Sequence, residues 1–240
     1  MSGRASLTHG IEAHPRRSFL SDFILGSQDG LVNILGILLG VAAASTNLRI
    51  ILVATLAALG AESISMGAVA YTSTAARRRF YQGEEQRELV EMREVPEIER
   101  SEVREVLTNW GYAGEKLDQL LAMICENPKA MLEFMMAFEL RLQPVDADEP
   151  SKSGLTVLAA TMVGSLVPLV PFLFLYQEIR LAVLASALVS GIVLFLIGWY
   201  EARTTNSSVW RSGLTMLAIG LSAGFAGFLI GHFLGASGAL

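Results

Sequence analysis

The chain has 240 residues, of which 52% are hydrophobic, with a mean hydropathy of +0.47 and a formal net charge of −5. This composition is too apolar for an ordinary soluble domain, and the negative charge argues against nucleic acid as a partner. A single cysteine, Cys125, excludes an intrachain disulfide and a thiolate metal cage, and we expect it to be a small buried apolar residue. We predict an all-α, polytopic membrane protein.

Charge is concentrated in one segment. Residues 77–150 hold 17 of the 23 acidic residues and 10 of the 18 basic ones. Two apolar blocks flank this charged insert. We therefore predict an N-terminal tail over residues 1–18, without a secretory signal, two transmembrane helices over 19–76, a helical insert over 77–150 and three transmembrane helices over 151–240.

Five apolar segments approach or exceed the roughly 20 residues that cross a bilayer as a helix. We expect spans near residues 19–44, 48–76, 154–176, 181–200 and 209–234, with prolines 168 and 171 inside the third. Glycines four residues apart in the first and last spans predict close helix contacts. Nine flanking Lys and Arg residues lie on one side and two on the other, which places the N-terminus and the insert in the cytoplasm.

The second span passes into the charged insert without a glycine–proline break, so we expect one long helix there. Pro96 should end it and begin a second helix that reaches about Trp110. A third should cover residues 116–125. Asn127, followed by Pro128, should cap a fourth that ends near Leu142, and residues 144–154 should form a linker.

Two carboxylates fall inside predicted spans. Asp29 lies one helical turn before Asn33, and Glu62 lies one turn before Met66, so each pair shares a helical face. A carboxylate in an apolar span is costly and usually marks an ion pathway. The alternative for Asp29 is a helix-end carboxylate that touches water.

The insert carries glutamates in pairs with i, i+3 spacing, Glu88 with Glu91 and Glu99 with Glu102, followed by Glu105. Two such pairs on successive helices could converge on a divalent cation such as Mg²⁺, Mn²⁺ or Fe²⁺. The alternative is a solvated face paired with neighbouring arginines.

Three methionines, Met131, Met135 and Met136, precede Glu139 on the fourth predicted insert helix. Thioether sulfur beside carboxylates would favour a transition metal. The alternative is a methionine stripe that packs in an apolar core.

At this point the residues resemble a known family, the vacuolar iron transporters (VIT-like). The motif Asp29-Gly30-Leu31-Val32 and the motif Ser65-Met66-Gly67-Ala68 are similar to the family's first and second helices. The stretches ELVEMREVPEIERSEVREVLTNWGY and PKAMLEFMMAFELRL resemble its cytosolic metal-binding domain. The resemblance covers about residues 19–240.

The resemblance implies a homodimer with a pathway at its interface and an insert that collects divalent iron. It assigns Asp29 and Met66 to the pathway. It assigns to metal binding the insert residues Glu88, Glu91, Glu99, Glu102, Met135, Met136 and Glu139. Where many members read Gly-Glu-Tyr, this chain reads Val69-Ala70-Tyr71, and Glu62 is our own assignment to the pathway.

We therefore expect a transporter that exports Fe²⁺, and also Mn²⁺ or other divalent ions, from the cytosol by proton antiport, without a permanently bound cofactor. Its partners would be metal ions, protons, membrane lipid and a second copy of the chain. The compact loops suit a bacterial inner membrane, and a vacuole-like organelle is the alternative. The rival function is a membrane-anchored metal-binding or sensing module. We expect no enzyme, because the three histidines lie near the chain ends and no nucleophile–base set is present.

Overall fold

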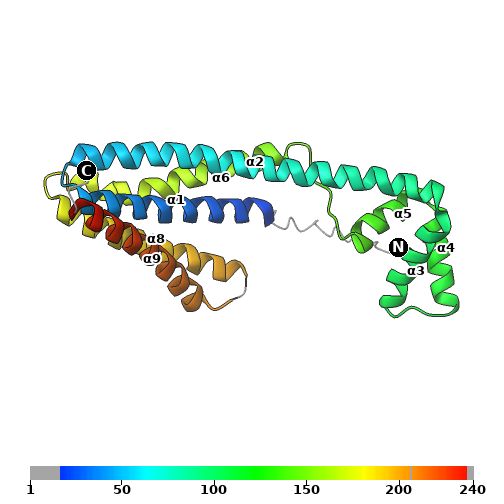
Figure 1. The fold of residues 1–240 in the computed structure, drawn as a ribbon. Coiled ribbons are helices and arrows are strands. Elements are labelled where there is room, and N and C mark those ends of the chain that lie inside the picture. The colour runs from blue at the N-terminus through cyan, green and yellow to red at the C-terminus, as the bar shows by residue number, and fades with distance from the viewer. Residues whose placement is uncertain (1–16, 206, 237–240) are drawn as a thin grey trace, which may run out of the picture. The chain divides into compact units, whose positions relative to one another are not determined.

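The computed structural model describes residues 17–205 and 207–236, and in these ranges every regular element is helical (Figure 1). The all-α prediction is confirmed for that part of the chain, and residues 1–16 of the predicted tail lie outside it. The elements are α1 (Arg17–Ala44), α2 (Leu48–Glu94), α3 (Pro96–Asn109), α4 (Glu115–Glu126), α5 (Pro128–Phe134), η1 (Met135–Glu139), α6 (Glu149–Leu166), η2 (Val167–Leu169), α7 (Val170–Phe174), α8 (Ile179–Thr204) and α9 (Val209–Ala236).

Five helical segments are long and apolar enough to cross a membrane, as predicted. They cover Phe19–Ala44, Leu48–Glu94, Glu149–Phe174, Ile179–Thr204 and Val209–Gly235. The chain divides into two compact units. Among the described residues, those in 17–70 and 152–236 form a membrane unit and those in 71–151 form an insert unit. Helix α2 is a single continuous helix that contributes to both.

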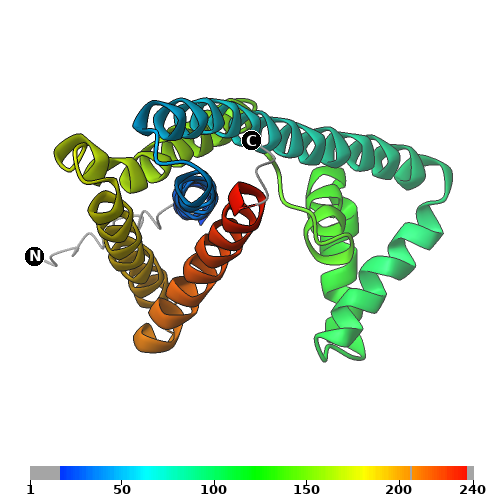
Figure 2. The same cartoon turned by 60° about the vertical axis from the view of Figure 1, so that its left-hand side comes forward.

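The membrane unit is built around α1, which packs along α9, while α9 packs along α8 (Figure 2). Gly40 of α1 lies against Gly227 of α9, and a Cβ atom at either glycine would overlap the other helix's backbone. Small residues therefore allow these two backbones to touch. The predicted glycine contacts occur within one chain, so they give no support to a contact between protomers.

The third apolar segment differs from the prediction at both ends. The helix starts at Glu149, inside the expected linker, because the Glu149 carboxylate accepts a hydrogen bond from the Asp146 N–H at 3.4 Å and Pro150 suits a first turn. At the other end the expected single helix breaks at Pro168 and Pro171, and a 3₁₀ turn joins α6 to α7. The Ser186 hydroxyl donates to the Pro168 carbonyl at 2.6 Å, which satisfies a backbone acceptor at this break.

Several helix ends in the insert lie where the sequence predicts them. Helix α2 ends at Glu94, Pro96 occupies the first turn of α3, and the Asn127 side chain caps α5 by accepting from two backbone N–H groups at 3.1 and 3.3 Å. The fourth helix does not continue to Leu142, because α5 passes into a π-helical turn, η1, in which the Leu140 N–H bonds the Met135 carbonyl at 3.1 Å. The insert has its own apolar core, which includes Val103, Leu107, Leu117, Leu121, Met131, Phe134 and Met135.

The close approach of α1 and α9 can be tested with Gly227→Val. The added side chain meets the Gly36 backbone, so we expect a loss of about 1–3 kcal/mol in unfolding free energy, measured by denaturation in detergent. Gly60→Ala is the matched control, because a Cβ at Gly60 meets no other atom within 4 Å. Equal stability of the two variants would show that the α1–α9 contact does not limit stability.

Candidate functional site

The insert brings three glutamates together where α2 ends and α3 begins. Glu88 and Glu91 lie one turn apart on α2, and Glu99 lies in the first turn of α3. One carboxylate oxygen from each of the three lies within 4.8 Å of the others. Glu88 and Glu99 are each only 3% exposed. The predicted convergence of glutamates from successive helices is thus present, and these oxygens are spaced as the ligands of one cation would be.

Several carboxylate oxygens of this region are buried without a hydrogen-bond partner among the described residues. They are Oε2 of Glu88, Oε2 of Glu99 and Oε2 of Glu139. Glu139 comes from the π-helical turn, a feature that often occurs at functional sites. A buried carboxylate oxygen without a partner is unfavourable, and a proton or a cation would relieve it.

Burial and mutual repulsion affect the pKa values of a group of glutamates in the insert. Burial raises the pKa of Glu99 to about 7, and the charges of Glu102, Glu88 and Glu91 add to the effect. Burial likewise raises the pKa of Glu139 to about 7, with Glu102, Glu88 and Glu91 as the repelling neighbours. The pKa of Glu88 is also raised, chiefly by burial. We call Glu88, Glu91, Glu99, Glu102 and Glu139 the glutamate cluster, because these electrostatic interactions connect all five carboxylates.

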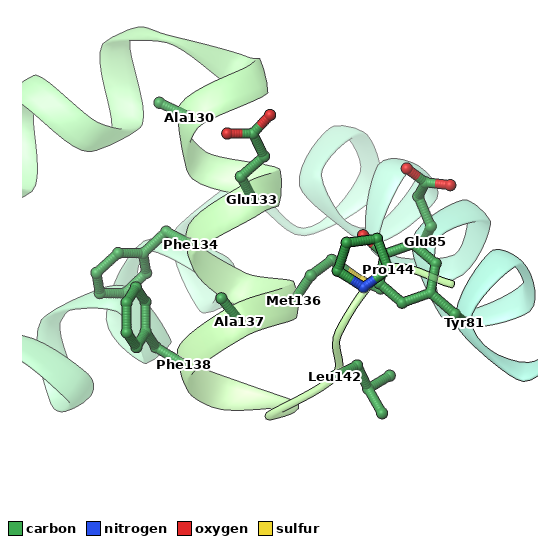
Figure 3. Close-up of a pocket in the computed structure, with 10 residues that line it drawn as sticks. All are labelled: Tyr81, Glu85, Ala130, Glu133, Phe134, Met136, Ala137, Phe138, Leu142 and Pro144. Carbon is green, nitrogen blue, oxygen red and sulfur yellow. The ribbon is translucent and has the colours of Figure 1, made fainter. Parts of the chain in front are cut away.

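The methionines divide between core and cavity. Met131 and Met135 pack in the apolar core of the insert, as the alternative expected. Met136 is also buried, but it lines a cavity of about 620 Å³ together with Tyr81, Glu85 and Glu133. Figure 3 shows Met136 extending from η1 toward Tyr81 and Pro144, with the two carboxylates coming from different helices. Met136 therefore lines this cavity, while Met131 lines another of about 460 Å³, and Met135 lies fully in the core.

The structure also shows the surroundings of Glu105 and Cys125, two other insert residues that the sequence singled out. Glu105 lines a smaller cavity, of about 350 Å³, which it shares with Glu102 and Glu139 of the glutamate cluster. Cys125 is partly buried and packs against the insert core, in agreement with its expected role as a small apolar residue. The cavity beside Tyr81 was not predicted, and neither was the position of Glu102 in both the glutamate cluster and the smaller cavity. Both depend on how α2, α3 and η1 pack.

In the membrane unit, α1 and α2 bring polar side chains together. The Asn33 amide Nδ2 donates a short hydrogen bond to Oε1 of Glu62, and Asp29 lies close enough to interact electrostatically with Glu62. Met66 lies one turn beyond Glu62 on α2, and Asp29, Glu62 and Met66 are all partly buried. Sequence reasoning placed Asn33 on the face of Asp29 but gave it no role.

Comparisons with known proteins agree over nearly the whole chain. The sequence model of the VIT family matches residues 20–232. Vacuolar iron transporter 1 of Oryza sativa subsp. japonica is 32% identical over 226 residues, which are 92% of this chain and 89% of that protein. Vacuolar iron transporter 1 of Arabidopsis thaliana is 32% identical over 225 residues, 93% and 90% of the two chains. A vacuolar iron transporter of Plasmodium falciparum (isolate 3D7) is 28% identical over 231 residues, 93% and 85%.

The raised pKa values predict how the metal-free insert responds to pH. Glu99 and Glu139 have a folded-state pKa of about 7 against an ordinary 4.5, so the folded state binds more protons than the unfolded state between these values. Stability of the insert should therefore fall as pH rises from about 4.5 to about 7 and change little above that. Divalent cations at pH 8 should restore it. Hydrogen exchange of the backbone amides of residues 96–139 measures both effects in the full chain.

Replacement of Glu88, Glu91, Glu99 and Glu102 by Gln should abolish metal binding and the metal-dependent protection. The matched control replaces four exposed glutamates of the insert helices, Glu94 on α2, Glu97 on α3, and Glu115 and Glu126 on α4, and should keep both. Unchanged Fe²⁺ and Mn²⁺ binding after the first replacement would show that these glutamates do not bind the metal.

Proposed function

The chain belongs to the VIT family, and from that premise we propose that it transports Fe²⁺ across its membrane, out of the cytosol. Relatives named vacuolar iron transporter support iron as the cargo. The observation that carries the proposal is the pairing of Asp29 on α1 with Glu62 on α2 inside apolar spans. A simple membrane anchor has no need of carboxylates there, whereas a pathway for a cation does.

In this proposal the insert captures the ion. The glutamate cluster supplies carboxylate oxygens, which suit Fe²⁺ and Mn²⁺ alike, and the Met136 thioether would favour Fe²⁺ over harder ions. Because Glu99 and Glu139 have a pKa of about 7, ion binding near neutral pH displaces protons from the cluster. Apparent affinity should therefore fall by up to about tenfold per pH unit below pH 7 for each displaced proton.

Asp29, Glu62 and Met66 then replace part of the hydration shell of the ion within the membrane. Two titratable carboxylates at one site allow a proton and a cation to compete for the same oxygens. That competition is a physical route to proton antiport, in which metal travels one way and protons the other.

We further propose that the protein acts as a homodimer. Asn33 is exposed on the single chain, and Asp29 and Glu62 are partly exposed, although all three lie within apolar spans. Polar groups at such positions face protein or a water-filled cavity rather than lipid. A second copy of the chain that covers this face would meet the requirement.

The side that holds the insert is proposed to be the cytosol, because nine basic residues flank the spans on that side against two on the other. The relatives are named for the vacuole, which gives no support to the bacterial inner membrane expected from the short loops. The proposed direction of transport, away from the insert's side, is the same for either membrane.

The alternative is a membrane-anchored protein that binds or senses metal through the insert and transports nothing. The buried, unpartnered oxygens of the glutamate cluster suit this function equally well. Asp29 and Glu62 do not, and the flux measurement below separates the two functions.

Asp29→Asn keeps the shape of the side chain but removes its charge, so we expect it to stop Fe²⁺ flux into liposomes without unfolding the protein. Met66→Leu keeps the volume and removes the sulfur, so Fe²⁺ flux should fall more than Mn²⁺ flux. Glu178→Gln, in the loop before α8, is a control that removes a carboxylate outside the helices and should transport as the parent does. Parental flux through Asp29→Asn would mean that the pathway does not pass Asp29.

Orientation can be tested with two single cysteines in a Cys125→Ser background. Ala113→Cys lies in the loop between α3 and α4, and Gln177→Cys lies in the loop between α7 and α8. An impermeant maleimide added to intact cells that carry the protein in the plasma membrane should label Gln177→Cys and spare Ala113→Cys until the cells are permeabilised. The reverse pattern would place the insert outside the cytosol.

A further inference from the structure

A hydrogen bond between two predicted spans joins Asn33 of α1 to Glu62 of α2. The amide nitrogen Nδ2 is the donor and the carboxylate oxygen Oε1 is the acceptor. A charge-assisted hydrogen bond of this kind is stronger than one between neutral groups. It therefore fixes one oxygen of a side chain that otherwise rotates about three bonds.

Nothing in the fold of α1 requires an amide at this position. Asn33 is exposed, whereas its neighbours Leu31, Ile34 and Leu35 are fully buried and supply the packing. Within the described chain, the hydrogen-bond partner of the Asn33 amide is Glu62. The amide is thus explained by its bond to Glu62 rather than by packing.

The charge at this place also fits a divalent ion. Asp29 and Glu62 together carry two negative charges when both are ionised, and Asn33, one turn from Asp29, adds a polar group without a third charge. The hydrogen bond occupies one lone pair of Oε1, which leaves Oε2 as the freer oxygen of Glu62 for an ion. Single-oxygen binding suits small ions such as Fe²⁺, whereas Ca²⁺ prefers six to eight oxygens and often takes both oxygens of a carboxylate.

We propose that Asn33 is a positioning residue of the transport pathway, which holds the Glu62 carboxylate in a one-oxygen binding mode and so favours small divalent ions over Ca²⁺. This inference rests on the proposed transport of Fe²⁺. Asn33 acts through Glu62, so its effect disappears when Glu62 no longer carries a charge.

The experiment measures the KM and maximal rate of Fe²⁺ flux in liposomes, with and without competing Ca²⁺. Asn33→Leu should raise the KM for Fe²⁺ at least about tenfold and make Ca²⁺ a stronger competitor, since a hydrogen bond to a charged group is lost. Asn33→Asp keeps the shape but replaces the donor by a third carboxylate, and it should raise the KM as well. Gln28→Leu removes an amide from the same helix and should keep the parental KM.

A double-mutant cycle gives the specific readout. Asn33→Leu combined with Glu62→Gln should be no worse than Glu62→Gln alone, because the two residues act as one unit. Parental KM in Asn33→Leu, effects that multiply in the double variant, or an equal rise in Gln28→Leu would each overturn the inference. If Asn33→Leu is not recovered from the membrane, Asn33→Asp replaces it in the KM measurement, the Ca²⁺ competition and the double-mutant cycle, and the same outcomes would overturn the inference. Flux by the parent protein in the same liposomes tests the proposed transport separately.

Discussion

Closely spaced negative charge is the constraint on which both units depend, and in the glutamate cluster Arg87 offsets part of it through its ion pair with Glu91 at 3.8 Å. In the insert, buried oxygens of Glu88, Glu99 and Glu139 have no hydrogen-bond partner in the described part of the chain. In the membrane unit, Asp29 and Glu62 interact within apolar spans, and the described partner of Glu62 is a neutral amide. A buried arginine would neutralise such groups permanently and yield a structural ion pair. Exchangeable protons or metal ions would neutralise them reversibly, which is the chemistry that the proposed transport requires.

The apolar core of the insert offsets the repulsion among the carboxylates of the glutamate cluster. Repulsion within the glutamate cluster favours separation of α2, α3 and η1, while burial of Val103, Leu107 and Leu121 holds α3 and α4 together. Met131 and Met135 bring η1 and α5 into the same core. The cluster is thus held at a close spacing by apolar packing. This is how a protein can keep a binding site formed before its ligand arrives.

Local signals allowed much of the fold to be predicted. Five apolar segments, the break at Pro96 and the Asn127 cap depend on residues near one another in sequence, and the structure agrees with each. The π-helical turn at η1 was not predicted, because it depends on particular backbone hydrogen bonds. The early start of α6 has local signals in Glu149 and Pro150, which the expected linker over residues 144–154 overlooked. Glycine spacing indicated that helices approach closely, but not which ones. Likewise, i, i+3 spacing placed glutamates on shared faces, and only the packing of α2 against α3 shows which faces meet.

The second span shows why position along a helix matters as much as composition. The family resemblance leads one to expect a glutamate at residue 70, where this chain has alanine, while Glu62 lies eight residues earlier, or about 12 Å along a helix. At that depth the polar groups of α1 that meet Glu62 are Asn33, by hydrogen bond, and Asp29, by charge. An acid moved along α2 would be costly in an apolar span unless α1 offered it a partner there. Glu62 and Asn33 are therefore best understood as one unit, an acid of the second helix together with the amide of the first that holds it.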